Sequence, residues 1–112
     1  MNQQMESKVK ELLCLIKEES AYKIYLQAKQ KLAGDTNAQA LLLSYKRAAH
    51  TLQVAAVNDA DADEKDVALF QALSMSLFEQ DNLAQLISNE LAVKSIISEI
   101  IQYLSSQLHI DY

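Results

Sequence analysis

Apolar residues recur along this chain at the three- and four-residue spacing that is typical of amphipathic helices. The first such segment covers about residues 5–19, where one stripe of side chains predicts a helix with a single apolar face. The stripe consists of Val9, Leu12, Leu13 and Ile16. Leu15 lies off this stripe.

A second helix is expected over residues 21–33. Ser20 has the side chain of an N-cap, and Gly34 has the conformational freedom of a residue that closes a helix in the left-handed region. Ser20 either interrupts the chain between two helices or bends one long helix, and the pattern leaves both alternatives open.

Two further helices are expected over residues 37–57 and 64–79. Asp35 or Thr36 is the expected N-cap of the first of them. Residues 58–66 read NDADADEKD, which is the one strongly polar stretch and therefore the predicted internal loop.

The last helix is expected over residues 83–107, with Asp81 or Asn82 as its N-cap. Its apolar stripe is wide enough for more than one neighbouring helix, so we expect the chain to associate with itself, as a dimer. The expected oligomer interface comprises Leu86, Val93, Ile97, Ile100 and Leu104.

Composition supports an all-α fold. The chain has 112 residues, no proline and one glycine, and tight β-hairpin turns depend on glycine. Half of the residues are hydrophobic and 22% are charged, which is enough apolar material for a packed core. We therefore expect one helical domain over residues 1–112, an elongated bundle of four to five helices with a long C-terminal helix.

The net charge of −5 conceals an asymmetry between the two halves. Residues 1–50 carry eight basic and five acidic side chains, a net +3, whereas residues 51–112 carry two basic and ten acidic ones, a net −8. The overall balance argues against direct nucleic-acid binding. The basic half is either a solvated surface or a partner face, and in the second interpretation direct RNA binding is the alternative to protein binding. That face would comprise Lys23, Lys29, Lys31, Lys46 and Arg47.

The sequence gives little support for catalytic activity or cofactor binding. Cys14 is the only cysteine, so it cannot form an internal disulfide or hold a zinc ion or iron–sulfur cluster alone, and a reduced cytoplasmic setting fits best. His50 and His109 have no His, Cys or carboxylate at helical spacing. No phosphate-binding or nucleophile motif occurs. We therefore expect a protein without enzymatic activity, metal or cofactor, and without a membrane-spanning segment.

The acidic run Asp59, Asp61 and Asp63 resembles the start of a calcium-binding EF-hand loop. However, the sixth position of such a loop would be Glu64 in place of glycine, and the twelfth would be Phe70 in place of a bidentate glutamate. A solvated loop is the better interpretation, and a small-ligand or metal sensor rests only on this run and the lone thiol.

The chain resembles the YlbF/YmcA family of small helical bacterial proteins. The resemblance lies in IKEESAYKIYLQAKQKL, residues 16–32, and GDTNAQALLLSY, residues 34–45. The family run E-S-x-x-Y-x-x-Y-x-x-A-x-x-x-L-x-x-D-x-x-A-Q-x-L is matched, with every position after the serine one place early, by Glu19, Ser20, Tyr22, Tyr25, Ala28, Leu32, Asp35, Ala38, Gln39 and Leu41. The family's Asn-capped last helix with an internal acid is matched by Asn82, Leu83, Glu90 and Ile100.

The resemblance implies an all-α cytoplasmic protein of Gram-positive bacteria that forms homo- or hetero-oligomers. It also implies a non-catalytic adaptor in the control of competence, sporulation or biofilm formation, with related helical paralogues and an mRNA-processing endoribonuclease as partners. Some members are associated with iron–sulfur clusters through cysteines near the C-terminus. This chain ends in SSQLHIDY and has only Cys14, so that property does not carry over.

Overall fold

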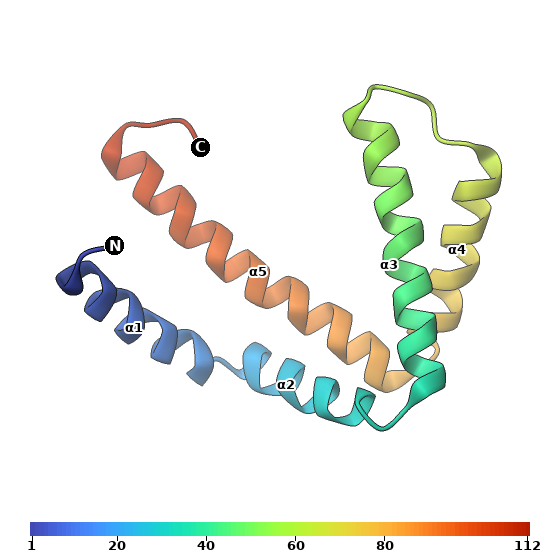
Figure 1. The fold of residues 1–112 in the computed structure, drawn as a ribbon, viewed down its shortest axis with the longest axis horizontal. Helices are drawn as coiled ribbons and strands as arrows, with labels where there is room; N and C mark the ends of the chain where they lie inside the picture. The colour runs from blue at the N-terminus through green and yellow to red at the C-terminus, as the bar shows by residue number, and fades with distance from the viewer. The chain divides into compact units, whose positions relative to one another are not determined.

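The computed structural model describes residues 1–112 and contains five α-helices and no strand (Figure 1). The all-α prediction is confirmed. The helices are α1 (Gln3–Glu18), α2 (Ser20–Leu32), α3 (Thr36–Val57), α4 (Glu64–Phe78) and α5 (Asp81–Leu108).

The chain breaks between α1 and α2 at a single residue. Glu19 is extended, with φ −63° and ψ 139°, and its N–H donates to the carbonyl of Ile16 at 3.1 Å. Two separate helices therefore replace the alternative of one bent helix. Ser20 is the first residue of α2, so its prediction as the N-cap is wrong by one position.

The helices form two compact units. The first, here called the hairpin unit, comprises Ala28–Ala84; the second, the terminal unit, comprises Met1–Gln27 together with Gln85–Tyr112. A single domain over residues 1–112 stays a prediction.

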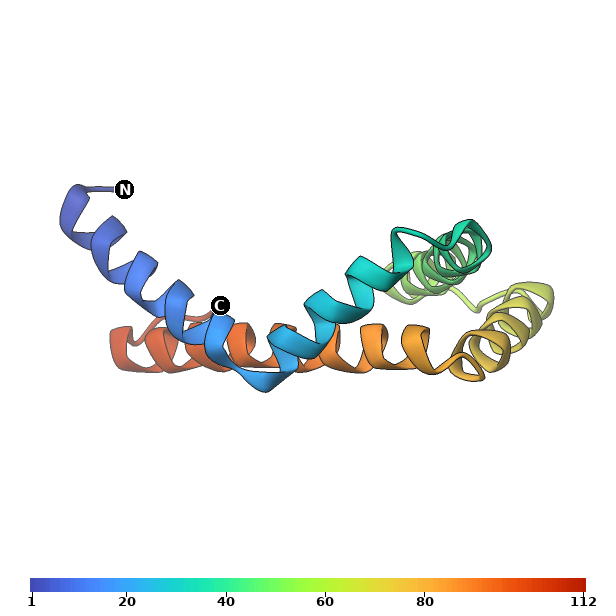
Figure 2. The same cartoon turned by 90° about the horizontal axis from the view of Figure 1, so that it is seen from below.

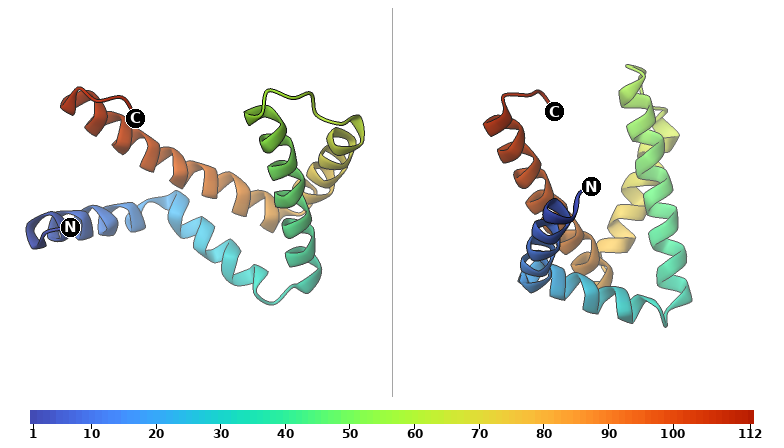
Figure 3. Two further views of the ribbon diagram at one scale, coloured as in Figure 1. Left: turned by 45° about the horizontal axis from the view of Figure 1, so that its top comes forward. Right: turned by 60° about the vertical axis from the view of Figure 1, so that its left-hand side comes forward.

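In the hairpin unit, α3 and α4 run side by side (Figures 1 and 3). Tyr45 of α3 stacks on Phe70 of α4 with ring centroids 5.4 Å apart, and it meets Phe78 edge-on at 6.5 Å. Leu77 and Leu83 are completely buried. Aromatic contacts of this geometry add to the area that they bury, so this cluster fixes α3 against α4.

Small residues complete the core of the hairpin unit. Ala28, Ala38 and Ala48 are all buried, one in α2 and two in α3. A methyl side chain allows a neighbouring backbone to approach closely, which is why alanine occupies these positions rather than leucine.

The turn between α2 and α3 is built by two side chains of the family-like run. The Asp35 carboxylate accepts the N–H of Ala38 at 3.0 Å and is the N-cap of α3. The Gln39 amide donates to the carbonyls of Leu32 and Ala33, at 2.8 and 3.2 Å. The Leu32 carbonyl also accepts the N–H of Asp35 at 3.0 Å, so Gln39 adds a second bond there and supplies one to Ala33 just beyond the end of α2.

This capping explains why the prediction for Gly34 is wrong. Gly34 does not have a positive φ, and its N–H donates to the carbonyl of Lys31 at 3.3 Å. A left-handed residue is one way to satisfy the last carbonyls of a helix. Here the N–H groups of Gly34 and Asp35 bond the carbonyls of Lys31 and Leu32, and the Gln39 side chain adds to them.

Asn82 is engaged with α2 rather than capping its own helix. Its side-chain amide donates to the carbonyl of Ala28 at 3.0 Å, across 54 positions of the chain. Both predicted caps, Asp81 and Asn82, lie inside the first turn of α5, because that helix begins at Asp81. Asn82 thus links the end of α2 to the start of α5 within the hairpin unit.

Candidate functional site

The polar loop between α3 and α4 ends one helix and begins the next. Asp59 has φ 55°, and the N–H groups of Asp59 and Ala60 donate to the carbonyls of Ala56 and Ala55. This is the Schellman pattern of a helix end, with Asp59 in the left-handed position.

The other end of the same loop starts α4. The Asp63 carboxylate accepts the N–H of Lys65 at 2.9 Å and is the N-cap. No group of three or more His, Cys, Asp or Glu side chains is arranged to hold a metal ion. Two of the three aspartates of the calcium-like run therefore have a defined structural role that needs no ion.

The predicted interface on α5 divides along the helix. Leu86 is buried, with 2% of its surface exposed, so it belongs to the core of the terminal unit and is not free for a partner. Val93 and Ile100 are half-buried, and Ile97 and Leu104 are exposed. The C-terminal half of α5 is therefore the part of the predicted face that remains open.

A second Schellman motif closes α5. His109 has φ 57°, its N–H donates to the carbonyl of Ser106 at 3.3 Å, and the N–H of Ile110 donates to the carbonyl of Ser105 at 3.1 Å. Ser105 is buried, and its hydroxyl donates to the carbonyl of Ile101 at 2.8 Å. This role of His109 could not be predicted from the sequence, because a left-handed histidine carries no signal comparable to that of glycine.

The chain after α5 folds back along the helix (Figure 1). A small cavity of about 250 Å³ lies between this segment and the last turns of α5. Its lining is mostly apolar and comprises Ile101, Leu104, Ser105, Leu108, Ile110 and Tyr112. The apolar face of α5 thus continues into the C-terminal segment.

The apolar stripe predicted on α1 is present but is not buried. No residue of α1 is buried, and Val9, Leu12 and Leu13 are exposed while Ile16 is only half-buried. Figure 2 shows the reason within the terminal unit: beyond the break at Glu19, α1 diverges from the line of α5 toward its N-terminal end.

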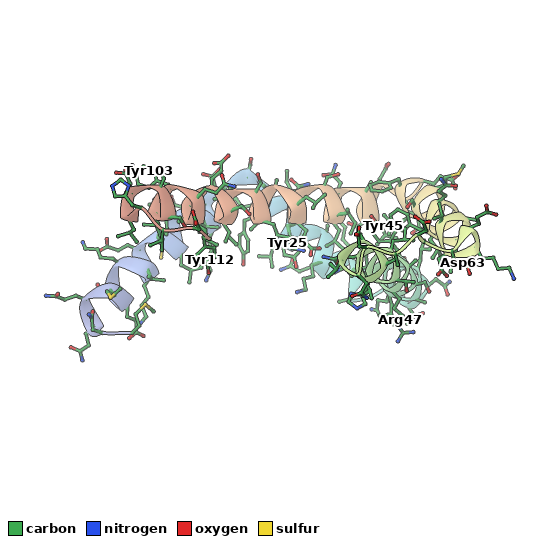
Figure 4. All side chains as sticks on the ribbon, turned by 90° about the horizontal axis from the view of Figure 1, so that it is seen from above. Tyr25, Tyr45, Arg47, Asp63, Tyr103 and Tyr112 are labelled. Carbon is green, nitrogen blue, oxygen red and sulfur yellow. The ribbon has the colours of Figure 1, made fainter.

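The five basic residues of the predicted partner face are all exposed. Lys23, Lys29 and Lys31 lie on α2, and Lys46 and Arg47 lie on α3. Figure 4 shows the Arg47 side chain projecting from α3. Lys29 and Lys31 occupy the last turn of α2, where cations interact favourably with the helix dipole.

A shallow groove of about 320 Å³ lies between α3 and α4. Its lining comprises Ser44, Arg47, Ala48, Thr51, Asp66, Leu69 and Leu73. The groove is mainly apolar, and Arg47 and Asp66 add one charge of each sign. The Thr51 hydroxyl is already engaged with the backbone carbonyl of Arg47 at 3.1 Å. This groove has the character of a contact surface between helices.

The remaining candidate residues are isolated. Cys14 is an exposed free thiol on α1, and His50 is exposed on α3. None of the five helices combines the length and the apolar character required to cross a bilayer.

Comparison with known protein families gives a match over nearly the whole chain. The family model described as "Control of competence regulator ComK, YlbF/YmcA" matches residues 5–109. No curated protein and no solved structure gives a significant match to the chain. Because the match covers all five helices almost completely, the chain belongs to the YlbF/YmcA family, which is named for the control of the competence regulator ComK.

Proposed function

We propose that this chain is a non-catalytic, oligomeric adaptor that acts in the cytoplasm through protein–protein contacts. The observation that supports the proposal most directly is the exposed apolar face of the C-terminal half of α5, with Ile97 and Leu104 both exposed. Contiguous apolar surface of this kind on a charged, water-soluble chain favours a protein interface.

In this proposal α5 supplies the oligomer interface and the basic residues of α2 and α3 contact a different partner. The regulatory role of the family supports an adaptor over an enzyme. The family resemblance suggests related helical paralogues and an mRNA-processing endoribonuclease as partners, in the control of competence, sporulation or biofilm formation.

The interface assignment is tested by Ile97→Asp combined with Leu104→Asp. Burying carboxylates in an apolar contact is unfavourable, so we expect light scattering to show the mass of the single chain, 12.5 kDa, in place of an oligomer. Gln27→Asp, at an exposed polar position of α2, is the control and should leave the mass unchanged. An oligomer that persists in the double variant would refute the interface.

The partner is tested by capture from the native host at low and moderate salt, with and without nuclease. An endoribonuclease or a helical paralogue that remains bound after nuclease treatment would support the adaptor. Charge reversal of Lys31 and Arg47 to Glu should then weaken that capture while leaving the oligomer intact.

Direct RNA binding is the second candidate, because all five basic residues of the partner face are exposed. Binding through phosphate contacts must weaken steeply as salt increases. Titration of a labelled single-stranded RNA at two salt concentrations tests this candidate, and a flat response or no binding at low salt would eliminate it.

A further inference from the structure

Two apolar faces of the terminal unit are left uncovered. On α1 the face comprises Met5, Val9, Leu12, Leu13 and Ile16, of which the first four are 36–58% exposed. On α5 it comprises Ile97, Ile100, Leu104 and Leu108, of which all but Ile100 are 44–65% exposed. Both faces have helical periodicity, so each can accept a helix along its length.

The two faces match in length. Met5 to Ile16 and Ile97 to Leu108 each span eleven residue steps, which is ~16 Å at the rise of an α-helix. Within the chain, α1 does not cover α5, because the extended Glu19 directs α1 away from it (Figure 2). Each face therefore lacks the partner that the other one would supply.

We propose that α1 is an exchanged arm, whose apolar stripe packs on the C-terminal half of α5 in a second copy of the chain. A two-fold axis makes the contact reciprocal, so one dimer covers both faces of both copies. This inference deepens the proposed oligomeric function and rests on it.

The area is sufficient for a stable dimer. At ~50 Å² of exposed apolar surface per side chain, nine side chains supply ~450 Å² on each copy. An interface that is roughly 57% apolar then buries about 800 Å² per partner, which is the standard size of a specific protein interface.

The helix dipoles favour an antiparallel arrangement of the arm. This arrangement places the positive N-terminal end of α1 beside the negative C-terminal end of the partner's α5. Formal charge does not oppose it, because residues 5–16 carry two basic and two acidic side chains, against one acidic side chain in residues 97–108. The ion pairs of Lys8 and Lys10 within α1, at 3.4 and 3.6 Å, are largely exposed to solvent and contribute little to the choice. In this register Val9 lies close to Leu104 of the second copy.

The first test compares two substitutions of the same chemistry on α1. Leu12→Asp alters the stripe, and Leu15→Asp alters an exposed leucine of the same helix that lies off the stripe. We expect light scattering to give half the mass for Leu12→Asp and an unchanged mass for Leu15→Asp. Leu104→Asp and Leu91→Asp form the equivalent pair on α5, since both leucines are exposed and only the first belongs to the face. Equal masses within either pair would overturn the arm.

The second test uses the single native cysteine. In a Cys14→Ser background, a chain with Val9→Cys is mixed with a chain with Leu104→Cys, and a short bismaleimide is added. The exchanged arm predicts a cross-linked species of twice the chain mass. A chain that carries both new cysteines should likewise give dimers.

The outcomes distinguish a failure of the exchanged arm from a failure of the proposed oligomeric function. A cross-link formed only within the doubly substituted chain would mean that α1 closes on its own α5, and it would overturn the arm. An oligomer by light scattering with no link between positions 9 and 104 would overturn the arm and keep the proposed function. A single-chain mass for the unsubstituted protein would overturn both.

Discussion

The hairpin unit and the terminal unit use the same kind of amphipathic helix with opposite results. In the hairpin unit, α3 and α4 cover each other, and Leu77 and Leu83 are completely buried. In the terminal unit, α1 has an equally regular apolar stripe and buries no residue. Helical periodicity indicates that a helix face packs against another element. It does not indicate whether that element belongs to the same chain.

This difference bears on what each unit contributes. A helix that packs inside its own chain gains stability independently of concentration, whereas one that packs on a second copy gains it only when the copies associate. We therefore expect the hairpin unit to determine the intrinsic stability and the terminal unit to determine the assembly. Four substitutions separate these two roles.

The largest effect is expected from Leu77→Ala. Truncation of a fully buried leucine lowers the free energy of unfolding by ~2–5 kcal/mol through lost burial and the cavity that remains. Leu13→Ala on α1 is the matched change at an exposed site, and it should cost less than ~1 kcal/mol in dilute protein. Urea unfolding by circular dichroism measures both. A similar loss for the two variants at high dilution would mean that α1 is packed within its own chain.

A pair of N-caps gives the next comparison. Asp35→Ala removes the acceptor for Ala38 N–H at the start of α3, and Asn2→Ala removes the acceptor for Met5 N–H, 2.8 Å away, at the start of α1. Loss of a cap costs ~0.5–2 kcal/mol of helix stability. We expect only Asp35→Ala to lower the global free energy of unfolding, because α1 can fray without exposing a core.

Amide hydrogen exchange distinguishes the two caps further. Asn2→Ala should accelerate exchange within residues 5–9 and leave α3 unchanged. If the global stability fell equally in both variants, the contrast between the two units would be wrong.

Much of the fold is predicted correctly by the pattern of apolar and polar residues. The predicted helices at residues 37–57, 64–79 and 83–107 agree with α3, α4 and α5 to within two residues at each end. Of the two predicted N-caps of α3, Asp35 and Thr36, the structure shows Asp35, and a short polar side chain before an apolar stripe is a local signal.

Features that depend on distant partners could not be predicted from the pattern. Asn82 lies where an N-cap is expected, yet its side-chain amide donates to the carbonyl of Ala28, 54 positions earlier in the chain. Leu86 and Leu104 occupy equivalent positions in one stripe, and only the three-dimensional arrangement shows that the first is core and the second is surface. The sequence therefore predicts that the candidate interface is one face of α5. The structure is needed to show that only the C-terminal part of this face is exposed.

A smaller effect is expected at Gln39, which joins α2 to α3. Gln39→Ala removes two side-chain hydrogen bonds to exposed carbonyls and should lower the free energy of unfolding by ~1 kcal/mol. Gln39→Glu loses the same two donors, and its carboxylate lies near both the negative end of α2 and the positive end of α3, so the two dipoles offset each other. Urea unfolding gives both values, and a Gln39→Ala variant as stable as the unsubstituted chain would argue against the capping role.

The smallest effect is expected at Gly34, and it has the opposite sign. Since Gly34 does not have a positive φ, and an added Cβ would meet its nearest atom, the Lys31 carbonyl oxygen, at an ordinary 3.9 Å, alanine fits there without strain. Gly34→Ala reduces the entropy of the unfolded chain and should raise the free energy of unfolding by ~0.4–1 kcal/mol. Asp59→Gly is the complementary change, because Asp59 is the residue of the hairpin unit that does occupy the left-handed region, which glycine adopts without strain. It should therefore not destabilise the chain, and urea unfolding measures both variants. A destabilising Gly34→Ala would mean that α2 ends through a left-handed glycine, and the capping role of Gln39 would then fail.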